Sequence, residues 1–395
     1  MPRDDSISRR DFARLGIAAS LVPALGAAAS IPGPAATTVP ELQPAGAASW
    51  PGYEAAVAID LLATPGPFNV EGMFARPLGA RMVANAKASG MTAVNVTVNG
   101  NGVGAMAFEQ TVRAVAFWAR ELAQHPGVWT QVRTLADVRG AKASKRVGII
   151  LGFQDTTMYE NDLSRVDLFH DMGVRIVQLT YNVRNLAGDG CLERANAGLS
   201  AFGRALVGRL NSLGSLVDLS HCGRQTTMDG IETSVKPVAV THSGCSAIAD
   251  VPRNKPDDIL RRLADRGGVV GIYLMPFLRV SGQPMAEDFM RHLTHALDVC
   301  GEDHVGIGSD NSITPIELTP EFRQIHRESI MARRARGISA PGEDPDVFTF
   351  VPDINSPRRL ELIADLMAKA GHSSARIEKV IGGNWVRLLG EVWGT

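Results

Sequence analysis

The sequence predicts a single (β/α)8 barrel of the TIM type. Eight short apolar runs of β-type composition alternate with helical patterns from residue 50 onward. Two of these runs end in a histidine and one ends in an aspartate. Such endings are typical of a barrel, because its active site lies at the carboxyl ends of the strands. The competing fold is a doubly wound open sheet, but no glycine-rich GxGxxG phosphate loop follows the first run.

The eight expected strands are separated by helices whose ends carry start and stop signals. The strands are residues 57–60, 92–98, 147–152, 175–180, 216–220, 238–241, 269–274 and 305–308. Before the fifth strand, apolar residues recur at helical spacing and stop at Gly214. Pro256 and Gly267 delimit a helix over residues 257–266.

Two further helices are expected at the C-terminus, over residues 357–370 and 375–389. Ser356 and Ser374 directly precede these segments and are the predicted N-caps. Because the eight strands are already complete, we expect these helices to pack outside the barrel.

Composition and charge indicate an enzyme that acts on a small molecule. The chain has 395 residues, 45% of them hydrophobic, and a formal net charge of −1. It can therefore bury a large core, and it lacks the basic excess of a nucleic-acid-binding protein. We expect no nucleic-acid partner.

The N-terminus has the pattern of a twin-arginine export signal over residues 1–30. Arg9 and Arg10 precede an apolar stretch over residues 15–26, and small residues follow it. The stretch is too short for a permanent membrane span. We therefore expect a periplasmic protein, the alternative being a cytosolic one whose N-terminal helix is incidentally apolar.

Residues 31–49 have the composition of a disordered linker, so the folded unit is expected over residues 50–395. An exported chain can form disulfides, but a domain of this size does not need them. We therefore predict no bridge among the four cysteines, Cys191, Cys222, Cys245 and Cys300.

Three strand-final residues are the first candidates for chemistry. His221 and His242 end the fifth and sixth predicted strands, and Asp310 follows the eighth. Histidine and carboxylate side chains at one end of a barrel indicate metal or acid–base chemistry. A histidine after a strand can also be a buried structural residue.

Several motifs, in this order and spacing, resemble the membrane dipeptidase (renal dipeptidase, peptidase family M19) group of amidohydrolase-type barrels. The resemblance extends over residues 152–310 and 380–389. It is carried by Leu179-Thr180-Tyr181-Asn182, Leu216-Val217-Asp218-Leu219-Ser220-His221, Thr241-His242-Ser243, Pro252-Arg253-Asn254, Gly306-Ile307-Gly308-Ser309-Asp310 and Ile381-Gly382-Gly383-Asn384-Trp385.

This resemblance implies a binuclear zinc site that hydrolyses dipeptides, and a possible homodimer. His221 and His242 match metal ligands, and Asp310 matches the residue that shuttles the proton. Arg253, followed by Asn254, matches the arginine that meets the substrate. Tyr181 stands where the family has a substrate-binding histidine, so its phenol is a candidate donor to the oxyanion.

Half of the family's metal site is absent from the sequence. Leu62 and Thr64 stand where the family has a histidine and an aspartate after the first strand, and Gln154 replaces the bridging glutamate. Gln154 can offer a neutral oxygen to a metal but cannot cancel its charge. We therefore expect one zinc ion, held by His221 and His242 with Gln154 or a water completing the coordination, or none.

Other carboxylates are candidates to replace the missing ligands: Asp60, Asp155 and Glu193.

The leading hypothesis is a dipeptidase-like hydrolase that cleaves a dipeptide or related small amide with metal-activated water. One alternative is a tailoring enzyme without hydrolytic zinc, acting on an exported peptide or siderophore precursor. Another is a ligand-binding barrel that has lost its chemistry. The side-chain pocket for the substrate is expected in loops such as residues 312–345.

Overall fold

The computed structural model describes residues 50–66, 74, 76–99 and 106–394. The predicted export signal and linker therefore lie outside the described residues. Within the described part of the chain, no helix is both long and apolar enough to cross a membrane. All four cysteines are free thiols.

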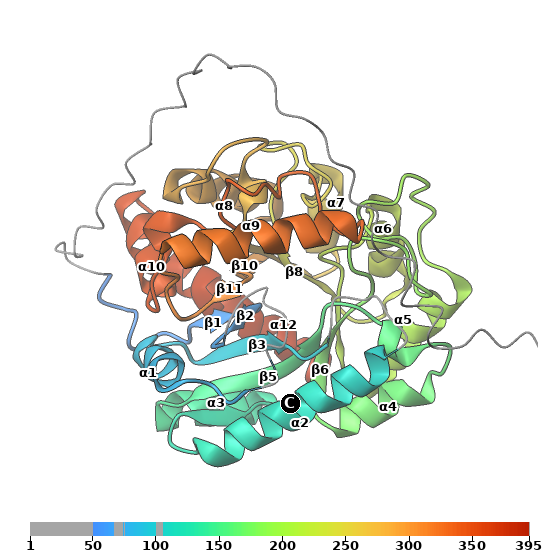
Figure 1. Ribbon diagram of the computed structural model, residues 1–395, viewed down its shortest axis with the longest axis horizontal. Helices are drawn as coiled ribbons and strands as arrows, with labels where there is room; N and C mark the ends of the chain where they lie inside the picture. The colour runs from blue at the N-terminus through green and yellow to red at the C-terminus, as the bar shows by residue number, and fades with distance from the viewer. Residues whose placement is uncertain (1–49, 67–73, 75, 100–105, 395) are drawn as a thin grey trace, which may run out of the picture. The chain divides into compact units, whose positions relative to one another are not determined.

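Eight parallel strands form the barrel, surrounded by helices (Figure 1). In spatial order they are β1 (Ile59–Asp60), β3 (Ala93–Thr97), β5 (Val147–Phe153), β6 (Val174–Gln178), β7 (Leu216–Asp218), β8 (Ala239–Ser243), β9 (Val269–Ile272) and β10 (Val305–Ile307). Each of these strands begins within two residues of the start of a predicted strand. The predicted fold class is confirmed.

The first and last strands meet and close the ring. The backbone N–H of Leu61 donates to the carbonyl of Ile307 at 3.0 Å, and that of Asp310 donates to Leu62 at 2.7 Å. Just beyond these bonds, β2 (Ala63–Thr64) and β11 (Asn311–Ser312) form a short parallel pair. These contacts place the residues after β1 directly beside Asp310.

The helices between the strands follow the alternation that the sequence indicates. They are α1 (Ala80–Ala88), α2 (Ala107–Gln124), α3 (Leu135–Ser144), α4 (Ser164–Asp171), α5 (Ala201–Leu213), α6 (Arg224–Thr233), α7 (Asp257–Asp265) and α8 (Ala286–Cys300). The α5 helix ends at Gly214 in the left-handed conformation, φ 71°, as its glycine predicts. The short strand β4 (Trp129–Gln131), which pairs with the start of β5, was not expected.

The C-terminal helices are α10 (Arg359–Lys369), α11 (Ser374–Glu378) and α12 (Asn384–Trp393), with a π-helical turn between the last two. The predicted caps were wrong by one or two residues. The side chain of Ser373, not Ser374, accepts from the N–H of Arg376, and Ser356 lies two residues before the N-cap of α10. The position at which the backbone enters the helix decides which residue is the N-cap, and this position is uncertain by one or two residues from sequence alone.

The last helix, α12, covers the end of the barrel at which the strands begin. Trp385 is fully buried in one cluster with the first residues of several strands, among them Ala93, Leu216 and Val269. Its indole Nε1 donates to the carbonyl of Ile307 at 3.0 Å. The end of the barrel opposite the histidines is therefore closed by apolar packing.

Residues 312–345, expected as loops, contain the 16-residue helix α9 (Pro320–Ala335). It begins at Thr319, whose side chain caps the N–H of Phe322, and Pro320 occupies the first turn. Its buried positions are His326, Ile330 and Arg333, at helical spacing. Because two of these three are polar, the sequence shows no apolar stripe to reveal the helix.

Candidate metal centre

His221 and His242 lie side by side at the carboxyl ends of β7 and β8. Their ring centroids are 5.0 Å apart, and both side chains are buried. The Nε2 atoms of both rings are buried without any hydrogen-bond partner. Since an unpaired buried polar atom is costly, two adjacent ones indicate a place for a ligand.

The tautomer of His242 is set by a hydroxyl and a carboxylate. Its Nδ1 lies 2.9 Å from Oγ1 of Thr241, which donates its own proton to Asp218 at 2.6 Å. Thr241 can therefore only accept from the ring, so Nδ1 carries the proton and Nε2 keeps its lone pair.

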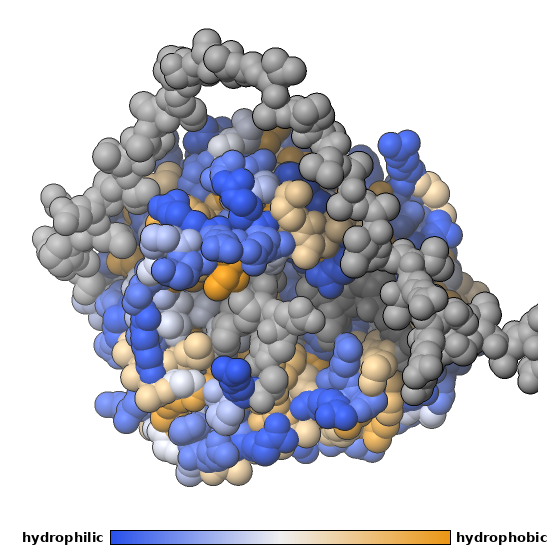
Figure 2. Space-filling view, in the orientation of Figure 1, coloured by the Kyte–Doolittle hydropathy of each residue, from blue (hydrophilic) through white to orange (hydrophobic). Residues whose placement is uncertain are grey.

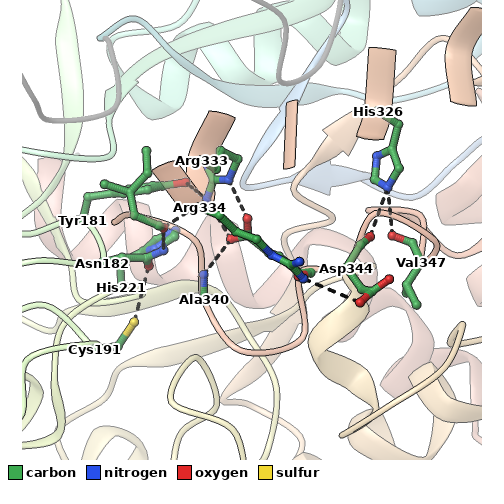
Figure 3. Close-up of polar contacts among 12 residues, drawn as sticks. Tyr181, Asn182, Cys191, His221, His326, Arg333, Arg334, Ala340, Asp344 and Val347 are labelled. Atoms are coloured by element: carbon green, nitrogen blue, oxygen red, sulfur yellow. Dashed lines mark hydrogen bonds and ion pairs between the residues drawn. The ribbon is translucent and has the colours of Figure 1, made fainter. Parts of the chain in front are cut away.

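The ring of His221 is held on two sides. Its Nδ1 lies 2.6 Å from Oδ1 of Asn182, and the ring of Tyr181 stacks on it with centroids 4.2 Å apart. Figure 3 shows both partners beside it, contributed by the segment after β6. The amide oxygen accepts, so His221 also presents the lone pair of Nε2.

Both imidazoles are neutral at physiological pH. Burial holds the pKa of each histidine well below its usual value, and the nearby charges of Arg253 and Lys255 lower it further. A neutral imidazole is the form that binds a metal.

Asp310 lies at the closure of the barrel with a left-handed backbone, φ 56°. Gln154, at the end of β5, donates a side-chain hydrogen bond to its carboxylate. Burial raises the pKa of this carboxyl to about 7, against the opposing charges of Arg253 and Arg333. A carboxyl with such a pKa can take up and release a proton near neutrality.

The three candidate replacement carboxylates accept hydrogen bonds from backbone N–H groups of the protein. Asp155 accepts from the N–H groups of Thr157 and Tyr181, and Glu193 accepts from the N–H of Arg184. Both organise loops. Only Asp60 keeps a buried oxygen, Oδ2, without a hydrogen-bond partner.

Asp60 faces a buried arginine. Its Oδ1 accepts from the N–H of Ser309 at 2.8 Å, and the positive charge of Arg359 opposes the rise that burial causes in its pKa. Arg359 also donates to the side chain of Ser309 at 2.9 Å. The guanidinium of Arg359 therefore already supplies the positive charge that a metal would supply to this carboxylate.

Arg253 and Asn254, the predicted substrate-binding residues, are both buried. Arg253 donates to the carbonyls of Ser220, at 2.7 Å, and His242, at 3.4 Å, and its Nε has no partner. The side chain of Asn254 donates to the carbonyls of Ala249 and Phe277 and accepts from the hydroxyl of Tyr273. All of its hydrogen-bonding groups are thus engaged within the protein.

The sequence profile described as membrane dipeptidase (peptidase family M19) matches residues 79–321. The chain belongs to this family. A crystal structure of an amidohydrolase from Pseudomonas aeruginosa is 30% identical, with a TM-score of 0.73 over 87% of this chain and 98% of that one. A metallo peptidase from Rhodobacter sphaeroides, liganded with a phosphinate mimic of L-Ala-D-Ala, shares the fold at 20% identity, with a TM-score of 0.69 over 86% and 99% of the two chains.

Among curated proteins, dipeptidase tcpJ of Claviceps purpurea is 28% identical over 260 residues, covering 65% of this chain and 53% of that protein. The chain spans about half the length of the first curated relatives that it matches.

The donors that this M19 chain offers to a metal are few among the described residues. His221 and His242 offer two neutral nitrogen donors, whereas the side-chain amide of Gln154 donates to Asp310. The described residues contain no group of three or more His, Cys, Asp or Glu side chains that could hold a metal. Leu62, which is buried, and Thr64 supply neither histidine nor carboxylate to the other half.

Sequence reasoning missed four residues that shape this M19 site: Asp218, Asn182, Arg333 and Glu343. Asp218 lies inside a motif that carries the family resemblance, three residues before His221, and its carboxylate in a buried strand was a usable signal. Arg333 and Glu343 gave no such signal, since charged residues on a helix and a loop are usually solvated.

Proposed function

We propose that the chain is a dipeptidase-like hydrolase with a single zinc ion held by His221, His242 and Gln154. The observation that carries this proposal is the pair of neutral, buried imidazoles whose Nε2 lone pairs have no partner, beside a carboxyl of raised pKa. Zinc bound there would bring the acidity of a coordinated water close to neutral pH.

The residues around the histidines supply the remaining steps. Asp310, with its pKa of about 7, can accept a proton from the attacking water and deliver it to the leaving amine. Burial raises the pKa of Tyr181, so its phenol stays protonated and can donate to the carbonyl oxygen of the substrate.

The substrate proposed is a dipeptide or a related small amide with a free carboxylate. Arg253 and Lys255 are buried close to the two histidines, where their charges lower both histidine pKa values. They make the surroundings positive, which favours an anionic group near the scissile bond. The metallo peptidase from Rhodobacter sphaeroides that shares this fold binds a dipeptide mimic, which supports the same substrate class.

We propose a periplasmic location from the twin-arginine pattern of residues 1–30. Dimerisation stays a prediction from the family resemblance.

Metal analysis and a dipeptide panel test the function. Protein purified without added chelator should contain about one zinc per chain and hydrolyse at least one dipeptide, and His221→Ala should remove both properties. His372→Ala, in a segment near the C-terminus and far in sequence from the site, is the matched control. Absence of both zinc binding and hydrolysis in the wild-type protein would contradict the proposal. Thermal stabilisation by a dipeptide without turnover would instead favour a ligand-binding barrel.

A further inference from the structure

The segment formed by α9 and residues 336–347 docks on the side of the barrel mouth where His221 lies. The buried face of α9 carries His326, Ile330 and Arg333, and its other face is largely hydrophilic (Figure 2). His326 Nε2 lies 3.0 Å from the carbonyl of Val347, which ties the end of the segment back to the helix (Figure 3). The end of the segment near Val347 is therefore held against the middle of α9.

A buried ion pair determines the shape of the loop within this segment. Arg333 and Glu343 are both buried and bonded twice, Nε to Oε2 at 2.6 Å and Nη2 to Oε1 at 2.7 Å. Glu343 also accepts from the N–H of Ala340 at 3.1 Å, and Arg333 Nη2 donates to the hydroxyl of Tyr181 at 3.3 Å. Loss of either charge would leave the other buried and unpaired, so the pair strongly favours one loop conformation.

The loop reaches His221 through one amide. The side-chain Nδ2 of Asn182 donates to the carbonyl of Ile338 at 2.8 Å. Its Oδ1 accepts from Nδ1 of His221 at 2.6 Å and from the thiol of Cys191 at 3.4 Å. Because a backbone carbonyl can only accept, Ile338 decides which end of the amide faces the imidazole.

This chain of bonds determines where the proton of His221 resides. A neutral imidazole can carry its proton on either nitrogen, and a proton on Nε2 would occupy the lone pair that a metal needs. An acceptor at Nδ1 selects the tautomer with a free Nε2 and fixes the plane of the ring. Ile338 thus acts on His221 from a segment more than a hundred residues away in sequence.

We propose that Asn182 is a positioning residue for His221, and that residues 336–347 fix its orientation through the Ile338 carbonyl and the Arg333–Glu343 pair. The expected consequence, a higher affinity for zinc, rests on the proposed function. Its physical content, the tautomer of His221, holds for the metal-free protein as well.

The test reads the tautomer directly. Metal-free protein labelled with ¹⁵N-histidine is compared by long-range ¹H–¹⁵N correlation, with His221 assigned from the spectrum of His221→Ala. The wild-type ring should be protonated at Nδ1 only, and Asn182→Leu should give a mixture of both tautomers. Asn182→Asp, which still accepts at Nδ1, should restore the wild-type pattern. An unchanged tautomer in Asn182→Leu would overturn the proposal.

Zinc competition titrations provide the second readout. Asn182→Leu should weaken zinc binding by roughly 10- to 100-fold, the usual effect of removing a group that orients a metal-binding histidine. Glu343→Gln should weaken it too, but should add nothing in the Asn182→Leu background if the loop acts through Asn182. Gln324→Ala, on the exposed face of α9, is the control. Additive losses in the double variant would overturn the role of the loop.

The two proposals fail differently. If His221→Ala binds zinc as well as the wild type, the metal site is wrong, while the NMR comparison still tests the role of Asn182. If zinc binding depends on His221 but Asn182→Leu changes neither readout, only the positioning role is excluded.

Discussion

His221 and His242 lie with their rings 5.0 Å apart, and a different partner keeps Nδ1 of each ring protonated. Thr241, backed by Asp218, does this for His242, and Asn182 does it for His221. The two Nε2 lone pairs are therefore presented together at the mouth of the barrel. These two nitrogens are the donors on which the proposed zinc site rests.

Restoring the missing ligands should restore a second ion. The triple variant Leu62→His, Thr64→Asp, Gln154→Glu places the residue types implied by the family after β1 and at the end of β5. We expect its zinc content, measured by elemental analysis after dialysis, to rise from about one to about two per chain, because a second set of donors becomes available. Gln154→Glu alone, the control, should stay near one. A triple variant that folds but binds one zinc would show that the backbone after β1 no longer suits a metal.

Asp310→Asn should separate proton transfer from metal binding. The amide cannot take up a proton near neutral pH, so kcat should fall by roughly 10² to 10⁴-fold while the zinc content stays unchanged. Steady-state kinetics and elemental analysis on the same preparation check this. Asp171→Asn, at the exposed end of α4, is the control. A parallel loss of zinc would assign Asp310 to the metal instead.

Lys255 should make the stability of the protein depend on alkaline pH. Burial lowers the pKa of its ammonium group from 10.5 to about 8. Between these values the unfolded chain binds a proton that the folded chain has lost, so the free energy of unfolding rises with pH. The full shift corresponds to about 3 kcal/mol.

Comparison with Lys255→Met isolates this contribution. Urea unfolding at several pH values should show the wild-type protein gaining stability relative to the variant from pH 8 to 10.5. The control is Lys369→Met, on the exposed surface of α10, which removes one positive charge without removing a buried amine. A constant difference between wild type and Lys255→Met would contradict the buried-amine argument.

Two glycine variants should change stability in opposite directions. A Cβ on Gly308 would lie 2.0 Å from the carbonyl oxygen of Thr241, so Gly308→Ala should destabilise the barrel by about 2 kcal/mol or more. Gly208, on the exposed side of α5, has nothing within 4 Å, so Gly208→Ala should stabilise the helix by roughly 0.5–1 kcal/mol. Thermal unfolding of both variants checks the signs. An unchanged unfolding temperature in Gly308→Ala would mean that the backbone at Thr241 can move away from residue 308 at little cost.

The barrel strands were predictable because their signal is local. Each is a short apolar run bounded by polar or turn residues, and burial on both sides makes such runs stand out. The helix α9 was not predictable, since its buried face includes His326 and Arg333, whose burial depends on partners far along the chain. The predicted N-caps Ser356 and Ser374 were wrong for a smaller reason, since the exact turn of the backbone decides where each helix begins.

The sequence by itself determined the barrel, the family resemblance, and the residue types at the mouth, including the two histidines and the absent ligands at Leu62 and Thr64. Only the tertiary structure decided that Asn182 and Thr241 orient those histidines, and that Arg253 and Asn254 are largely engaged with the protein itself. The physical reason is that residue type and spacing follow from the chain alone, whereas a hydrogen-bond partner is chosen by folding. Asn182 meets Ile338 and His221 only because distant segments converge at one end of the barrel.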